Sequence, residues 1–258
     1  MIRTALFLAC LLASLGTGWA GDQVREHDIA VQLETSSRVG RAVKISVGSQ
    51  AFLGFYTDAE KTDNRNVALI LHDTDEHPDQ EFVVHQLRSL LPQHNWASLS
   101  IQLPMREHGA NQADYYPLFD EAKSRIEAAG EYLRQNQAET IVIIGYGLGG
   151  LMGLYTVNSQ PEGWSALVTI SLAIPESNLS QLQIGEFLKN IALPLLDVYA
   201  ESDLPSVVDS ARQRRLMAKQ NPVYRQIRLD NEDHSFKNDP ELLVKRVYSW
   251  LNLIHKQQ

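Results

Sequence analysis

Apolar and polar residues follow each other along the chain with two different periodicities, one typical of strands and the other typical of helices. Near the start, AVQLE, VKISV and AFLGFYT are short β-rich segments separated by polar residues, and they predict an antiparallel entry into a sheet. Beyond them, apolar runs such as NVALILH and TIVIIG alternate with amphipathic segments such as EFVVHQLRSLL. This alternation predicts an α/β fold, with a mostly parallel central sheet of about eight strands and helices on both faces.

The later helices have recognisable ends. One is expected from about Pro117 to Gln135, and the last begins with Asp239 as N-cap and Pro240 as its first residue. The last helix has an apolar stripe at helical spacing, formed by Leu243, Val247, Trp250, Leu251 and Ile254. The connection between SLAIP and the strand beginning near Leu193 is short, so little or no lid is expected over the carboxyl edge of the sheet.

The first twenty residues differ from the rest. MIRTALFLACLLASLGTGWA has a basic residue near its start, an apolar run and small residues up to Ala20, which is the layout of a secretory signal peptide. We therefore expect residues 1–20 to be removed near Ala20 and residues 21–258 to form a single domain. The mature protein would be periplasmic or secreted, with no transmembrane segment after signal removal.

Composition narrows the chemistry. Cys10 is the only cysteine and lies in the predicted signal, so disulfides, thiolate metal sites and cysteine catalysis are not expected in the mature chain. The formal net charge is −8, which gives no electrostatic reason to expect nucleic acid as a partner. No cofactor is expected.

The stretch IVIIGYGLGG, residues 141–150, reads as a strand, a tight turn and the start of a helix. It fits three functions: a dinucleotide-binding GxGxxG, a nucleophile-presenting GxSxG, or the latter without its serine. The dinucleotide interpretation requires an acidic residue at the end of the next strand, but VTISLA has none before Glu176. The hydrolase interpretation requires an acid and then a histidine, each just past a later strand; Asp203 and His234 occur in that order.

At these positions the chain resembles the α/β-hydrolase fold superfamily, and within it an exported proteobacterial branch. The resemblance spans about residues 40–255 and is carried by LILHD, WASLSIQLP, GYGLG and the Asp203–His234 pair. It implies an α/β-hydrolase-like domain in which Asp203 orients His234. It also implies an oxyanion hole formed by the backbone N–H of Leu148 and one from the loop at Asp73.

The sequence departs from the family pattern where the nucleophile would stand. The matching residue is Gly147, which has no atom that can attack a carbonyl, so His234 and Asp203 would be a vestigial dyad. Thr74, Tyr146, Ser171 and Ser235 are nearby hydroxyl residues, but none is at the apex of a strand-to-helix turn. If the other groups are aligned, Gly147→Ser is expected to create labelling by a fluorophosphonate probe.

These observations predict an exported α/β-hydrolase-like protein that has lost serine-hydrolase activity and acts as a binding or accessory protein of the cell envelope. Its partner would be a small molecule or an envelope protein. The alternative is a weak hydrolase of ester or related acyl bonds, in which His234 and Asp203 activate water. A metal-assisted variant would use His72 and His77 in the loop HDTDEHPD, although their spacing matches no standard metal motif.

Overall fold

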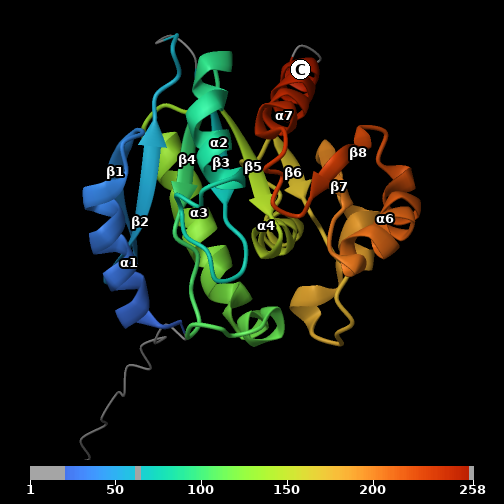
Figure 1. Cartoon of the computed structure of the whole chain (residues 1–258), viewed down its shortest axis with the longest axis horizontal. Helices are drawn as coiled ribbons and strands as arrows, with labels where there is room; N and C mark the ends of the chain where they lie inside the picture. Colours follow the sequence, from blue (N-terminus) through green and yellow to red (C-terminus); the bar gives the residue numbers. More distant parts are fainter. Residues whose placement is uncertain (1–20, 62–64, 256–258) are drawn as a thin grey trace, which may run out of the picture.

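The computed structural model describes residues 21–61 and 65–255. The predicted signal peptide, residues 1–20, lies outside the described residues. Eight strands form one sheet in the order β1-β2-β4-β3-β5-β6-β7-β8, and in Figure 1 this order runs from left to right. The strands are β1 (Arg41–Val47), β2 (Gln50–Thr57), β3 (Asn66–Leu71), β4 (Ala97–Ile101), β5 (Thr140–Tyr146), β6 (Ala166–Ile170), β7 (Leu195–Ser202) and β8 (Tyr224–Asp233).

The pairing confirms the mostly parallel sheet with an antiparallel entry. Strand β2 pairs antiparallel with both β1 and β4, and every other pair is parallel. The parallel strands β3, β5 and β6 are almost entirely buried, as their near-continuous apolar sequences predict for strands covered on two faces.

Helices cover both faces of the sheet. One buried cluster contains residues of α3, α4 and α5 packed on one face, and a second contains residues of α2 and α7 on the other. The helices are α1 (Gln23–Ser36), α2 (Val83–Leu90), α3 (Phe119–Gln135), α4 (Leu148–Ser159), α5 (Ile184–Asn190), α6 (Pro205–Met217) and α7 (Pro240–His255). In the described ranges, no helix combines the length and apolar character needed to cross a bilayer.

The last helix begins and packs as predicted. Asp239 accepts a hydrogen bond from the backbone N–H of Leu242 at 3.0 Å, as an N-cap should. Every member of the predicted apolar stripe is buried, which confirms the face that α7 turns towards the sheet.

The first predicted strand is wrong. AVQLE lies within α1, which packs beside β2 at the edge of the sheet (Figure 1). The Asp22 side chain caps α1 by accepting from the N–H of Arg25 at 3.1 Å, and Leu33 packs against Leu53 and Phe55 of β2. The segment is short and only weakly patterned, so these tertiary contacts decide its conformation.

Candidate functional site

The residues predicted to form a site follow the carboxyl ends of four strands. Asp73 follows β3, Gly147 follows β5, Asp203 follows β7 and His234 follows β8. Ligands of open parallel sheets bind at this edge. Strand β8 pairs with β7 up to Asp233, so His234, which follows β8, lies beside Asp203, which follows β7.

Gly147 forms the turn between β5 and α4. Its φ of +52° and ψ of −116° lie in a region that L residues adopt only with strain. The turn is tight because α4 approaches the sheet closely: a Cβ added at Gly149 would lie 2.6 Å from the carbonyl oxygen of His72. The glycines of GYGLGG are therefore explained by backbone geometry and packing, without a dinucleotide.

The carboxylate of Asp73 occupies the space beside Gly147. A Cβ added at Gly147 would lie 2.1 Å from Asp73 Cγ, far inside van der Waals contact. Asp73 Oδ1 accepts hydrogen bonds from the backbone N–H of Leu148 at 2.6 Å and of Thr74 at 2.7 Å. Two backbone donors thus converge beside the turn, and the second belongs to Thr74, one residue beyond the expected position. The Asp73 side chain itself lies at the Leu148 N–H.

His234 lies between two carboxylates. Its Nδ1 is 2.7 Å from Asp203 Oδ1, and its Nε2 is 3.1 Å from Asp73 Oδ2. Burial alone would lower the pKa of His234, but the hydrogen bonds to Asp203 and Asp73 and the charges of both raise it to about 9. His234 is therefore an imidazolium at neutral pH.

Several hydrogen-bond donors fix the carboxylate of Asp203. Its Oδ2 accepts from Ser171 Oγ at 2.6 Å and from the N–H of Ala200 at 3.1 Å, while Oδ1 also accepts from the N–H of Leu204 at 2.9 Å. Burial would raise the pKa of Asp203, but the hydrogen bonds from His234 and Ser171 outweigh it and lower that pKa. A buried carboxylate with this many donors stays ionised and fixes the His234 ring.

Comparison with known proteins places the chain in a family. A family model described as "Protein of unknown function (DUF3530)" matches residues 21–117 and 117–253. The chain belongs to the DUF3530 family. No curated protein sequence matches it.

Solved structures show which fold this DUF3530 chain shares. Est1E from Butyrivibrio proteoclasticus is 13% identical with a TM-score of 0.68, covering 83% of this chain and 99% of that one. A dienelactone hydrolase from Anabaena variabilis is 19% identical with a TM-score of 0.66, covering 81% and 94%. The esterase Pf2001 from Pyrococcus furiosus is 15% identical with a TM-score of 0.67, covering 82% and 91%. The chain therefore has the α/β-hydrolase fold.

The structure does not bring His72 and His77 together as metal ligands. His72 is buried; its Nδ1 lies 2.8 Å from the carbonyl oxygen of Asp73, and its Nε2 accepts from the N–H of Leu103 at 3.0 Å. Burial lowers the pKa of His72 to about 4, so it is neutral and supports the loop. His77 Nδ1 accepts from the N–H of Asp79. In residues 21–61 and 65–255, no three His, Cys, Asp or Glu side chains are placed to share a metal ion.

Three features of the DUF3530 site were not anticipated. Ser171 was considered only as a nucleophile, yet it donates to Asp203; its φ of +56° turns the backbone just after β6. Tyr146 donates its hydroxyl to the carbonyl oxygen of His234 at 2.9 Å. Burial raises the pKa of Glu76 to about 7, and the negative charges of Asp73 and Asp75 contribute to the same shift. Only the position of Ser171 at a strand end could have suggested its role.

Proposed function

We propose that this DUF3530 protein retains the α/β-hydrolase scaffold without serine-hydrolase activity, and that it acts as a binding or accessory protein of the bacterial envelope. The observation that carries the proposal is the Asp73 carboxylate, which fills the space beside Gly147 and accepts from the N–H of Leu148. Acyl transfer through a serine would need that space for the serine side chain and the Leu148 N–H as a donor to the oxyanion.

The charge of His234 supports the same conclusion. A general base must be neutral before it takes a proton, and the pKa of about 9 keeps His234 protonated at pH 7. Asp73 and Asp203 together stabilise that charge. The site is thus a network of ion pairs that holds three strand ends together.

A weak hydrolase is the second candidate, because the His234–Asp203 pair is intact at 2.7 Å and the fold is shared with an esterase and a dienelactone hydrolase. If His234 activated water, turnover would increase as pH approached and passed about 9, where the imidazole becomes neutral. The pH dependence therefore separates this candidate from a protein without activity.

The envelope location rests on the sequence of residues 1–20. Fractionation of cells producing the full chain should place a shortened protein, beginning near Gly21, outside the cytoplasm. A full-length protein that stays in the cytoplasm would refute this part of the proposal.

Activity is tested with the mature protein and its His234→Ala variant. Both are incubated with p-nitrophenyl acetate and p-nitrophenyl butyrate at pH 7 and pH 10, and with a fluorophosphonate probe. We expect no probe adduct and no turnover that depends on His234. Turnover at pH 10 that disappears in His234→Ala would establish the hydrolase instead, and a covalent probe adduct on any side chain of the site would overturn the proposal.

A further inference from the structure

The outer side of α6 presents large apolar side chains to solvent. Leu204, at the N-cap, is 48% exposed, Val208 is 36% exposed and Leu216 is 56% exposed, while the opposite side of the helix is buried. Figure 1 shows α6 at the right-hand edge of the molecule, at the other end of the sheet from α1. A single exposed apolar side chain needs no explanation, but three along one helix favour an interaction surface.

Basic side chains lie among these apolar ones. Arg212 and Arg215 are exposed residues of α6, and Lys219 is exposed in the short 3-10 turn that follows the helix. At about 100° per residue, Val208, Arg212, Arg215 and Leu216 fall within about a third of the helix circumference. In the described part of the chain, no ion pair involves Arg212, Arg215 or Lys219. Six residues form what we call the α6 face: Leu204, Val208, Arg212, Arg215, Leu216 and Lys219.

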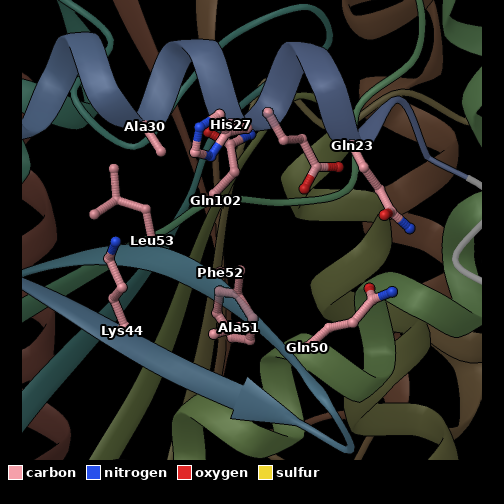
Figure 2. Close-up of a pocket in the computed structure, with 10 residues that line it drawn as sticks. Gln23, His27, Ala30, Lys44, Gln50, Ala51, Phe52, Leu53 and Gln102 are labelled. Atoms are coloured by element: carbon pink, nitrogen blue, oxygen red, sulfur yellow. The ribbon is translucent and has the colours of Figure 1, made fainter.

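The α6 face is basic although the chain as a whole has a formal net charge of −8. Asp209, the acidic residue of α6, lies beside this third of the circumference and not within it. Helix α1 also exposes Val24 and Val31, but the lysine beside it is paired: Figure 2 shows Lys44 projecting from the hairpin towards α1, where it contacts Glu34 at 3.0 Å. Unpaired cations beside exposed apolar side chains therefore distinguish α6 from α1.

The surface is hollowed beside the end of α6. An open hollow of about 460 Å³ lies between this end and α5, and its lining includes Leu216, Met217, Lys219 and Lys189 of α5. Lys189 is paired with Glu186 at 2.6 Å, whereas Lys219 has no ion pair among the described residues. A lysine can hold its charged end in a polar layer while its stem covers apolar surface. The hollow thus offers an apolar wall and an ammonium group side by side.

We propose that the α6 face docks the protein on the surface of a bilayer that contains anionic phospholipids. Its apolar members enter the boundary between headgroups and acyl chains, and its basic members contact the phosphates. An acidic protein surface would pair with the cations alone, whereas a bilayer supplies phosphate and hydrocarbon at adjacent depths and so matches both. Because α6 begins directly after Asp203, docking brings the site edge of the sheet close to the lipid.

The proposal is tested by flotation of the mature protein with vesicles. The probes are vesicles of phosphatidylethanolamine and phosphatidylglycerol, vesicles of phosphatidylcholine as the comparator without net charge, and poly-L-glutamate as an acidic polymer. We expect binding to the anionic vesicles, which weakens as sodium chloride is raised from about 50 to about 500 mM. Binding to phosphatidylcholine should be much weaker.

Two triple variants separate the charged and apolar contributions. The first replaces the basic members: Arg212→Gln, Arg215→Gln and Lys219→Gln. Since each basic residue near an anionic surface contributes roughly a fivefold factor, we expect the partition coefficient to fall roughly a hundredfold. The second replaces the apolar members: Leu204→Ser, Val208→Ser and Leu216→Ser. It should weaken binding at least about tenfold.

Matched controls change the same kinds of residue at exposed positions elsewhere. The charge control is Arg38→Gln, Lys245→Gln and Arg246→Gln, and the apolar control is Val24→Ser, Val31→Ser and Leu253→Ser. Both should bind nearly as the wild type does. Circular dichroism and urea unfolding confirm that each variant is folded before it is compared.

A fluorescent label reports which side of the protein meets the lipid. Residues 21–258 contain no cysteine, so Val208→Cys carries a single nitrobenzoxadiazole group on the α6 face, and Val31→Cys carries it on α1. On anionic vesicles we expect the emission of the label at position 208, and not of that at position 31, to shift to shorter wavelength.

The outcomes are separable. An absence of flotation with anionic vesicles would overturn the proposal, as would equal losses in the α6 variants and their matched controls. Binding to poly-L-glutamate that requires the basic members, with vesicle binding unchanged in the apolar variant, would assign the surface to an acidic protein instead. None of these results bears on serine chemistry at Gly147, which the fluorophosphonate experiment tests independently, and none requires that the chain be exported.

Discussion

Restoring a serine at the turn after β5 tests the role of Asp73 most directly. In Gly147→Ser the new Cβ would lie 2.1 Å from Asp73 Cγ, so the carboxylate must move away. It would then lose its bonds to the N–H groups of Leu148 and Thr74 and to His234. The variant Asp73→Gly removes the same three bonds and leaves the space empty.

The expected size of the effect follows from these contacts. Three hydrogen bonds to a charged group, at about 1.5 kcal/mol each, correspond to a loss of roughly 4 to 5 kcal/mol in the free energy of unfolding. A serine at a φ of +52° adds about 1 to 2 kcal/mol. The double variant Asp73→Gly/Gly147→Ser loses the three bonds only once. It should therefore be about 4 kcal/mol more stable than the sum of the single effects predicts.

Urea unfolding of the wild type, both single variants and the double variant measures this coupling. Gly48→Ser is the matched control, since Gly48 has a φ of +59° and an added Cβ there meets nothing within 4 Å. Labelling by a fluorophosphonate, followed by intact mass, reports whether the introduced serine becomes a nucleophile. We expect the double variant to be labelled at least about tenfold faster than Gly147→Ser, because in the single variant the displaced Asp73 carboxylate stays near the turn and its negative charge opposes the oxyanion that forms there.

Two outcomes would contradict this account. If Gly147→Ser lost no more stability than Gly48→Ser, Asp73 would not occupy the space beside the turn. If the folded double variant were never labelled, the arrangement of His234 and Leu148 would not be that of a hydrolase site. Because a Cβ added at Gly147 meets the Asp73 carboxylate, the double variant tests the substitution suggested by the sequence more directly than the single one.

Further predictions concern the charges and the helix ends. NMR titration should give His234 a pKa near 9 that falls in Asp73→Asn; a value near 6.5 in both proteins would contradict the ion pairs. Because the pKa of His234 is raised in the folded state, its contribution to stability is complete below about pH 6.5 and is lost as the pH rises through 9. Urea unfolding should therefore show that the free energy of unfolding of the wild type, relative to that of His234→Gln, falls by on the order of 3 kcal/mol between pH 6 and pH 10. Arg214→Met should cost about 3 to 5 kcal/mol in the same assay, since it leaves the buried Asp197 without its 2.8 Å partner, and a loss under about 1 kcal/mol would count against that pair. Asp239→Ala should cost about 1 kcal/mol by removing the cap of α7, and an unchanged midpoint would show that the cap contributes nothing.

The residue pattern alone was enough to predict the order of most elements and the edge of the sheet where the site residues lie. Apolar runs such as TIVIIG can be buried only in a sheet covered on both faces, and the stripe of α7 can face only its core. Asp203 and His234 follow neighbouring parallel strands, and the carboxyl ends of such strands necessarily share an edge. The weakly patterned segment AVQLE shows the limit of this reasoning, because contacts with β2 made it helical.

What the side chains at that edge do depends on contacts in three dimensions. Asp73 and Gly147 are 74 positions apart in the chain, and no local pattern indicates that the carboxylate of one fills the space left by the other. The charge of His234 depends on two carboxylates contributed by two different strand ends. Hydrogen bonds and close contacts act over a few ångströms in space, and their partners here are separated by long stretches of the sequence.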